Sequence, residues 1–177
     1  MTVPDATDAD AAVEELYAAH WRSLVRLSVL LVRDLGTAEE VVQDAFVAMH
    51  GRWNKLREPD KALAYLRQAV VNRSRSVLRH RKVVDRHVQQ EADQAPLTAP
   101  GADAGVLAAE RRTAVLEALA ALPRRQREVL VLRHYLDLTE AQIAATLGIS
   151  PGSVKSHASR GTQALRKQLG EAMEEDR

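Results

Sequence analysis

The chain has 177 residues, 46% apolar and 28% charged but only 3% aromatic, so we expect a folded protein with a core of Leu, Val, Ile and Ala, which suits helices. The absence of cysteine excludes disulfides, thiolate metal sites and cysteine nucleophiles. The net charge is +1, but the charges are unevenly distributed. Residues 13–82 have 13 Lys/Arg and 8 Asp/Glu, and residues 106–169 have 10 Lys/Arg and 5 Asp/Glu. These two basic blocks predict either two surfaces that bind a polyanion or ordinary solvated helix faces.

The amino-terminal residues MTVPDATDADAA are acidic and lack the apolar core of a secretion signal. No apolar run in the sequence is long enough to cross a bilayer. The sequence therefore predicts a cytoplasmic protein without membrane insertion.

Residues 13–82 have the apolar spacing of three helices. We expect the first to end near Gly36, the second to open with a capping box formed by Thr37 and Glu40, and the third to be capped by Asp60. The predicted inner faces are Val13, Leu16, Tyr17, Leu24, Leu27 and Leu31, then Ala38, Val41, Val42, Ala45, Phe46 and Met49, then Leu63, Leu66, Val70, Val77 and Leu78.

Residues 83–105 include QQEADQAPLTAPGADAG, in which Pro, Gly and small polar residues interrupt any apolar period over a stretch too long for an ordinary loop. This composition predicts a flexible linker between a domain at 13–82 and a second domain at 106–170. Fully extended, such a linker spans about 75 Å, so the two domains can bind sites about two DNA turns apart.

The second block begins with a predicted helix over residues 106–122, which Pro123 stops. The residues RRQREVLVLRHYL predict a further helix that ends near Leu136. Nothing in either block alternates like a strand, so the expected fold class is all-α, with two small helical domains joined by a flexible linker.

The stretch that follows predicts a helix-turn-helix. Thr139 with Gln142 is a capping box for the short helix AQIAATL, Gly148 supplies a tight turn, and Ser150 caps a helix whose first residue is Pro151. We expect Ile143, Leu147, Ile149 and Val154 to face inward. A second helix braced in this way can enter the DNA major groove; the alternative is a purely structural helical corner.

Four strings in this order carry a resemblance to a known family: TAEEVVQDAF, AYLRQAVVNRSRSVLR, ALPRRQREVLVLR and TEAQIAATLGISPGSVKSH. Together they resemble the RNA polymerase sigma factors of the extracytoplasmic-function (ECF) group of the sigma-70 family. The resemblance implies transcription initiation, with residues 13–82 as a region 2-like domain for the core polymerase and the minus-ten element. Residues 106–170 are then a region 4-like domain for the minus-thirty-five element.

The resemblance also implies the partners, namely the clamp and flap of core RNA polymerase and promoter DNA, with an anti-sigma factor as a candidate regulator. It implies no cofactor and no enzymatic activity, because the catalytic metal resides in the core enzyme. The six histidines are scattered without ligand spacing, which agrees with the absence of a metal site.

By the same resemblance, the helix at residues 37–50 docks on the clamp through Glu40, Gln43, Asp44 and Val47, a mixed acidic and apolar set that otherwise forms a solvated face. The third helix is expected to contact minus-ten DNA with a cation-rich polar side, near which Arg67, Arg73 and Arg81 also lie. The minus-ten residues are Trp53, Asn54, Tyr65, Gln68, Asn72, Arg75 and Arg79. Trp53 is expected near a pocket for a flipped base, or simply in the core.

The helix that begins at Pro151 is expected to read the minus-thirty-five element with its outward residues. These are Ser150, Gly152, Ser153, Lys155, Ser156, His157, Ser159 and Arg160, with Gln163 farther along. The sequence departs from the family pattern at Tyr65, where Trp is frequent, at Ser76, where an acid is frequent, and at His157 and Thr162, where Arg is frequent. The promoter sequence therefore cannot be inferred from relatives.

Two other classes of protein compete with this interpretation. A response-regulator-type activator has a similar helix-turn-helix, but its receiver requires alternating strands and helices that residues 13–82 do not predict. A helical adaptor would bind a protein and no DNA. An enzyme is disfavoured, because the sequence has no phosphate loop, nucleophile motif or cofactor fingerprint.

Overall fold

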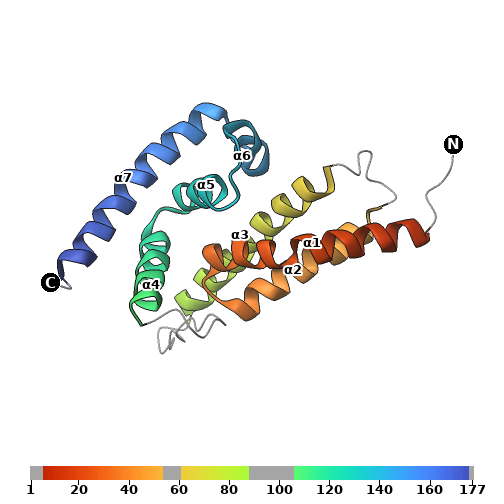
Figure 1. Ribbon diagram of the computed structural model, residues 1–177, viewed down its shortest axis with the longest axis horizontal. Coiled ribbons are helices and arrows are strands. Elements are labelled where there is room, and N and C mark those ends of the chain that lie inside the picture. The colour runs from red at the N-terminus through yellow and green to blue at the C-terminus, as the bar shows by residue number, and fades with distance from the viewer. Residues whose placement is uncertain (1–5, 54–60, 88–105, 176–177) are drawn as a thin grey trace. The chain divides into compact units, whose positions relative to one another are not determined.

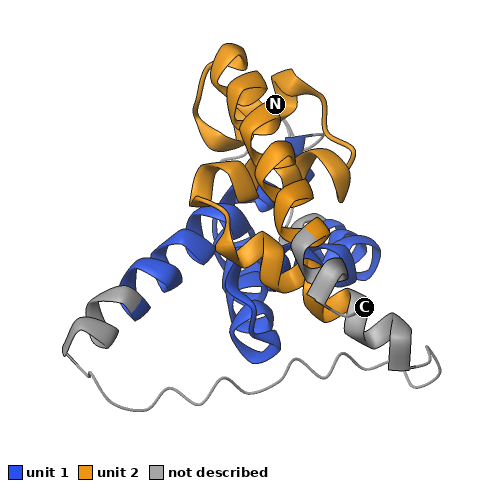
Figure 2. Cartoon of the chain, turned by 90° about the vertical axis from the view of Figure 1, so that its left-hand side faces the viewer, with its two compact units in different colours: residues 1–91 blue, residues 92–177 orange. Residues whose placement is uncertain are grey.

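The computed structural model describes residues 6–53, 61–87 and 106–175, and within these ranges the chain forms seven helices and no strand (Figure 1). The chain divides into two compact units, residues 1–91 and 92–177, which Figure 2 shows in different colours. Each unit has a helical core of its own. The prediction of an all-α chain with two small helical domains is confirmed.

The first unit consists of α1 (Ala6–Val32), α2 (Leu35–His50) and α3 (Ala62–His87), and each of these helices contacts the other two. The predicted inner face of α2 is confirmed, because all six of its residues are buried. Leu24 and Leu27 of α1 and Leu66 and Val70 of α3 are also in the core, each at most 1% exposed. Burying such side chains stabilises the fold by about 1.5–3 kcal/mol each.

The inner faces of α1 and α3 differ in part from the prediction. Tyr17 is 44% exposed, and the other predicted residues that are only partly buried are Val13, Leu16, Leu63, Val77 and Leu78. The buried positions of α3 advance by four residues and include Ser74, whose hydroxyl hydrogen-bonds with that of Ser28 on α1 at 3.2 Å. A paired hydroxyl can occupy a core position that an apolar period does not predict.

The predicted capping box at Thr37 is wrong, because α2 is capped by a different residue at the corner between α1 and α2. The first helix ends at Val32, Arg33 has a left-handed φ of 61°, and Asp34 is the N-cap residue of α2. Its carboxylate accepts a hydrogen bond from the backbone N–H of Thr37 at 2.7 Å. Asp34 lies three residues before Thr37 in the sequence and pairs with a free N–H group at the start of the helix. Thr37 therefore lies inside the first turn and does not cap it.

Arg81 of α3 closes the same corner. Its guanidinium donates to the carbonyl oxygen of Val32 at 3.1 Å and to the Thr37 hydroxyl at 2.7 Å. Arg81 also lies 3.7 Å from the Asp34 carboxylate. Hydrogen bonds from Thr37, and then the charge of Arg81, hold the pKa of Asp34 below its ordinary value despite partial desolvation.

The boundary of the predicted linker is also different, because α3 continues through residues 83–87. The remaining linker residues, 88–105, lie outside the described residues, as do Asn54 and the predicted cap Asp60. Among the described helices, none has the length and apolar character that crossing a membrane requires.

The second unit consists of α4 (Val106–Ala121), α5 (Arg124–His134), α6 (Glu140–Leu147) and α7 (Pro151–Glu175). The long helix α7 contacts the other three, and α5 also contacts α6. A close approach between α5 and α7 occurs at Gly161, where an added Cβ would lie 3.1 Å from a Leu130 methyl carbon. The absence of a side chain at Gly161 therefore sets how near the two helices lie.

Candidate functional site

One face of α2 is exposed and carries both acidic and apolar groups. Glu40, Gln43, Asp44 and Val47 are all exposed, and Val47 is 66% exposed. We call these four residues the α2 patch. Carboxylates beside an exposed apolar side chain can pair with cations and cover apolar surface on a partner helix.

Asp44 connects the α2 patch with α3. Its Oδ2 lies 3.7 Å from Nη1 of Arg73, and the two side chains are 67% and 38% exposed. An exposed ion pair contributes only about 0–1 kcal/mol, so Asp44 can exchange Arg73 for a partner's cation at little cost. Arg73 therefore lies beside the α2 patch, although the sequence analysis grouped it with the phosphate-binding cations.

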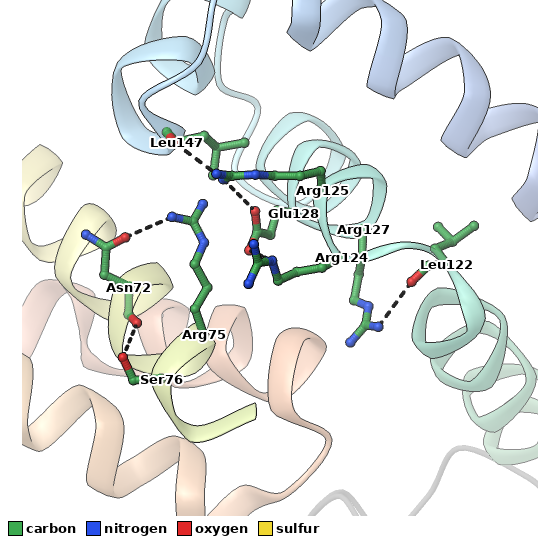
Figure 3. Close-up of polar contacts among 9 residues, drawn as sticks. All are labelled: Asn72, Arg75, Ser76, Leu122, Arg124, Arg125, Arg127, Glu128 and Leu147. Carbon is green, nitrogen blue, oxygen red and sulfur yellow. Dashed lines mark hydrogen bonds and ion pairs between the residues drawn. The ribbon is translucent and has the colours of Figure 1, made fainter. Parts of the chain in front are cut away.

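The polar side of α3 presents a row of amide and guanidinium groups. Gln68, Asn72 and Arg79 are exposed, whereas Tyr65 and Arg75 are partly buried. Arg75 donates to the Asn72 side-chain oxygen at 3.0 Å, and the Ser76 hydroxyl donates to the Asn72 carbonyl oxygen at 3.2 Å (Figure 3). The first bond holds an amide and a cation together about one helical turn apart.

The other cations of α3 have local roles that the sequence did not reveal. Arg81 is engaged in the α1–α2 corner, and Arg73 faces Asp44. Partial burial lowers the pKa of the Arg67 guanidinium, which still remains charged at neutral pH. Among the α3 side chains that the structure describes, Arg75 and Arg79 are cations on the same side as Asn72.

Trp53 follows directly after α2 and is partly buried. The aromatic cluster of the unit lies elsewhere, at Tyr17, Trp21 and Phe46, where the rings of Tyr17 and Trp21 stack with centroids 4.7 Å apart. Stacked and edge-on rings of this kind stabilise by about 0.5–1.5 kcal/mol beyond their burial. Trp53 is thus separate from the aromatic packing that joins α1 to α2.

The predicted helix-turn-helix is confirmed in its local chemistry. Thr139 and Gln142 form both hydrogen bonds of the capping box at the start of α6, and Gly148 ends the helix with a left-handed φ of 65°. The backbone N–H of Ser153 donates to the Ser150 hydroxyl at 3.1 Å, which caps α7. The two helices are therefore set by caps on either side of a glycine turn.

The outward side of α7 agrees with the prediction for most of its residues. Gly152, Lys155, Ser156, Ser159 and Arg160 are exposed, as are Ser150 and Gln163, whereas the inward residues Val154 and Ala158 are buried. Two predicted residues differ. Ser153 is partly buried, with its hydroxyl 2.9 Å from that of Ser150, and His157 is partly buried with its Nδ1 turned inward.

A concave surface lies between α5 and α7, and the hollow that it lines has a volume of about 660 Å³. Its lining residues are Arg133, His134, Lys155, Ala158, Ser159, Thr162, Gln163 and Arg166. The sequence pattern did not predict Arg133, His134 or Arg166 for this surface. The signal was a pair of basic residues in the last turn of α5, but only the crossing of α5 over α7 brings them beside Lys155. Together these groups can hold an anionic backbone.

A buried carboxylate supports the turn of the helix-turn-helix. Glu128 of α5 is 2% exposed, and it accepts a hydrogen bond from Arg125 at 3.2 Å (Figure 3). The same Arg125 nitrogen lies 3.4 Å from the carbonyl oxygen of Leu147, the last residue of α6. Arg125 thus links α5 to a helix end whose carbonyl lacks an intrahelical partner.

No cluster of three or more metal-binding side chains occurs in the part of the chain that the structure describes. The chemistry available at the described surfaces is that of ion pairs, hydrogen bonds and apolar contact.

Comparison with protein families gives two matches that divide the chain. Residues 16–83 match the model for sigma-70 region 2, and residues 112–165 match the model for sigma-70 region 4. The first match contains the α2 patch and the polar side of α3, and the second contains the helix-turn-helix and most of the concave surface.

Similar proteins cover nearly the whole chain. The RNA polymerase sigma-E factor of Streptomyces coelicolor is 32% identical over 158 residues, which are 88% of this chain and 85% of the relative. The ECF RNA polymerase sigma factor SigL of Mycobacterium tuberculosis is 32% identical over 171 residues, 96% of each chain.

Solved structures show the same fold. The sigma factor RpoE of Bartonella quintana, in complex with the anti-sigma factor NepR, gives a TM-score of 0.75 at 20% identity and covers 89% of this chain and 96% of its own. CnrH, in complex with the cytosolic domain of CnrY, gives a TM-score of 0.68 at 24% identity and covers 93% and 94%.

Proposed function

The chain belongs to the ECF group of the sigma-70 family of RNA polymerase sigma factors, and on that premise we propose which of its surfaces binds the polymerase and which bind the promoter. A sigma factor binds core RNA polymerase and directs initiation at particular promoters, and this is the function of the chain. The response-regulator and adaptor alternatives are not favoured, because region 2 occupies the segment where a receiver would lie.

The observation that carries the assignment of surfaces is their division between the two matched regions. The α2 patch in region 2 is acidic and apolar, whereas the concave surface in region 4 is cationic. Opposite chemistry calls for different partners. The α2 patch is proposed to bind the polymerase clamp, and region 4 is proposed to contact the flap as well as DNA.

The polar side of α3 is proposed to bind the minus-ten element as its strands separate. Asn72 and Arg75 form a preorganised amide and guanidinium pair, and Arg79 continues the row. Cations of this kind bind phosphates without sequence preference, and an amide or tyrosine ring can contact an unpaired base. Trp53 is proposed to border a pocket for a flipped base together with Asn54, which lies outside the described residues.

The outward side of α7 is proposed to read the minus-thirty-five element in the major groove. Arg160 can form a bidentate contact with guanine, and Gly152 lets the backbone near the helix start approach a phosphate. The concave surface beside α7 is proposed to hold the adjacent DNA backbone. The Ser150 hydroxyl caps the helix by accepting from the backbone N–H of Ser153, and the Ser153 hydroxyl lies 2.9 Å from that of Ser150.

Regulation by a masking partner is proposed from the solved neighbours, one of which is bound to an anti-sigma factor. Such a partner would cover the α2 patch and keep the chain from the polymerase. We further propose that the chain acts in the cytoplasm, where polymerase and promoters meet, and that it catalyses no reaction itself.

Reconstituted transcription tests these assignments. The full chain is mixed with core RNA polymerase and a promoter library, and the start sites of the transcripts are sequenced. Initiation at a defined set of promoters, absent with core enzyme alone, is the expected result. Core binding without promoter selection would contradict the assignment of α7, and promoter binding without core binding would contradict that of the α2 patch.

A further inference from the structure

An acidic residue contacts two of the cations that line the concave surface. Glu140 of α6 places Oε1 3.9 Å from Nη2 of Arg133 and Oε2 3.7 Å from Nζ of Lys155. Its side chain is 33% exposed, compared with 42% for Arg133 and 70% for Lys155. The carboxylate thus lies between a cation of α5 and a cation of α7.

Local structure keeps this carboxylate in place. Glu140 is the first residue of α6, where free N–H groups and the helix dipole favour a negative charge. Thr139 and Gln142 fix the start of the helix through reciprocal hydrogen bonds at 2.8 and 3.3 Å. The acid therefore belongs to the capped start of α6, while Lys155 is the more exposed member of the pair.

We propose that Glu140 is an internal anion that competes with DNA phosphates for Arg133 and Lys155, and that it thereby raises the promoter specificity of region 4. The inference rests on the proposed DNA-binding role of α7. A phosphate that approaches either cation must displace the carboxylate or accept its repulsion. Both possibilities weaken contacts to the DNA backbone.

The effect on specificity follows from the different contacts in specific and non-specific DNA complexes. Non-specific binding depends almost entirely on phosphate contacts, so an internal competitor weakens it directly. Contacts to base edges, such as the one proposed for Arg160, do not require Glu140 to move. Glu140 therefore lowers non-specific affinity more than it lowers affinity for the correct element.

Direct DNA-binding measurements on the full chain test the proposal. The probes are two labelled duplexes, one carrying the minus-thirty-five sequence selected in the reconstituted assay and one of scrambled sequence. The variants are Glu140→Gln, which removes the charge, and Glu140→Asp, which keeps it. Glu117→Gln is the matched control, because Glu117 is an exposed acid of α4 outside the lining of the concave surface.

We expect Glu140→Gln to bind the scrambled duplex about two- to fivefold more tightly at low salt, with a gain that vanishes at high salt. The slope of log affinity against log salt should steepen by about one unit for each cation released to a phosphate. Glu140→Asp should restore most of the wild-type behaviour. The ratio of specific to non-specific affinity should fall in Glu140→Gln alone.

Two outcomes would overturn the proposal. Equal effects of Glu140→Gln and Glu117→Gln would show that only net charge matters. Weaker binding by Glu140→Gln would show that the acid orients the cations instead of competing for them. A separate Lys155→Ala variant distinguishes a failure of the proposed function: if it leaves DNA affinity unchanged, α7 is not the binding helix. Circular dichroism of each variant establishes that the helices are intact.

Discussion

Single charged side chains at exposed positions carry most of the proposed contacts of this sigma factor. Asp44 is the clearest case, because it is exposed on α2 and its intramolecular partner Arg73 is 3.7 Å away and itself exposed. Asp34 is the opposite case. It lies at the corner between α1 and α2, and its contacts are all within the unit.

Reversing the charge at Asp44 should weaken binding to core polymerase. Asp44→Arg places a cation where a basic partner is proposed, and a like-charge contact costs several kcal/mol, so we expect a loss of at least about tenfold in affinity. Titration of labelled core enzyme measures it. Unchanged affinity with unchanged helicity would remove Asp44 from the interface, and Glu39→Arg on the same helix is the control for net charge.

Asp34 should make the stability of the first unit depend on pH. Its pKa is lowered in the folded chain, so its ionised form stabilises the fold above the ordinary aspartate pKa, and this stability is lost as pH falls through the folded value. Asp34→Asn keeps a capping oxygen but not the charge. The difference in melting temperature between wild type and variant should be largest near neutral pH and shrink below about pH 4; a constant difference would contradict the assignment.

Arg160 distinguishes base reading from phosphate binding. If it contacts a guanine, Arg160→Ala should cost about 1–3 kcal/mol at one promoter position and relax the preference there. If it contacts a phosphate, binding should weaken evenly across sequences. Transcripts from a library randomised in the minus-thirty-five element decide between the two, and identical profiles at identical yield would rule out both.

Helices position these residues through their ends as much as through their buried faces. The caps at Asp34, Thr139 and Ser150 start three of the helices, and Arg81 and Arg125 satisfy carbonyl groups at the ends of α1 and α6. Because a buried helix end without partners is costly, these arginines are held within the fold and are poor candidates for contacts with DNA.

The polar side of α3 should act as one element in opening the promoter. Replacing Arg75 and Arg79 together by Ala is expected to reduce open-complex formation and to lower the salt slope by roughly one unit for each lost phosphate contact. Permanganate footprinting across a salt series measures both. Open complexes that form as before at every salt concentration would show a merely solvated surface, and the joint replacement of Arg22 and Arg26, exposed cations of α1, by Ala serves as the control for charge.

On the scale of the whole molecule, the two units are proposed to carry different tasks. The acidic and apolar α2 patch belongs to the first unit, and the cationic concave surface belongs to the second. A promoter-specific initiator needs both tasks, and we propose that the first surface recruits the polymerase and that the second helps to select where it starts.

Variants in the two units should therefore fail in different ways. Asp44→Arg should lower transcription from every promoter, whereas Arg160→Ala should change the relative use of promoters. In the double variant the two free-energy changes should add, because substitutions at distant and independent sites usually have additive effects. Transcript sequencing at saturating and limiting chain concentrations measures this, and a promoter profile altered by Asp44→Arg alone would contradict the division.

The sequence by itself determined the all-α class, the inner face of α2, and the caps and glycine turn of the helix-turn-helix. These features depend on interactions between residues three or four positions apart, so they are visible as apolar period, capping box and glycine turn. The family resemblance added the tasks that are proposed for the exposed side chains. The predicted cap at Thr37 was wrong because Asp34 competes for the same N–H groups, and two acceptable caps three residues apart look equivalent in sequence.

Tertiary structure alone decided which cations are engaged within the fold. Arg73 and Arg81 contact partners that lie at least 29 residues away along the chain, and no local sequence pattern predicts such pairs. Likewise, Arg133 and Glu140 join Lys155 only because α5, α6 and α7 cross one another. The sequence shows which charged residues lie on the exposed face of each helix. The packing angle between helices decides which of those charges come together on one surface.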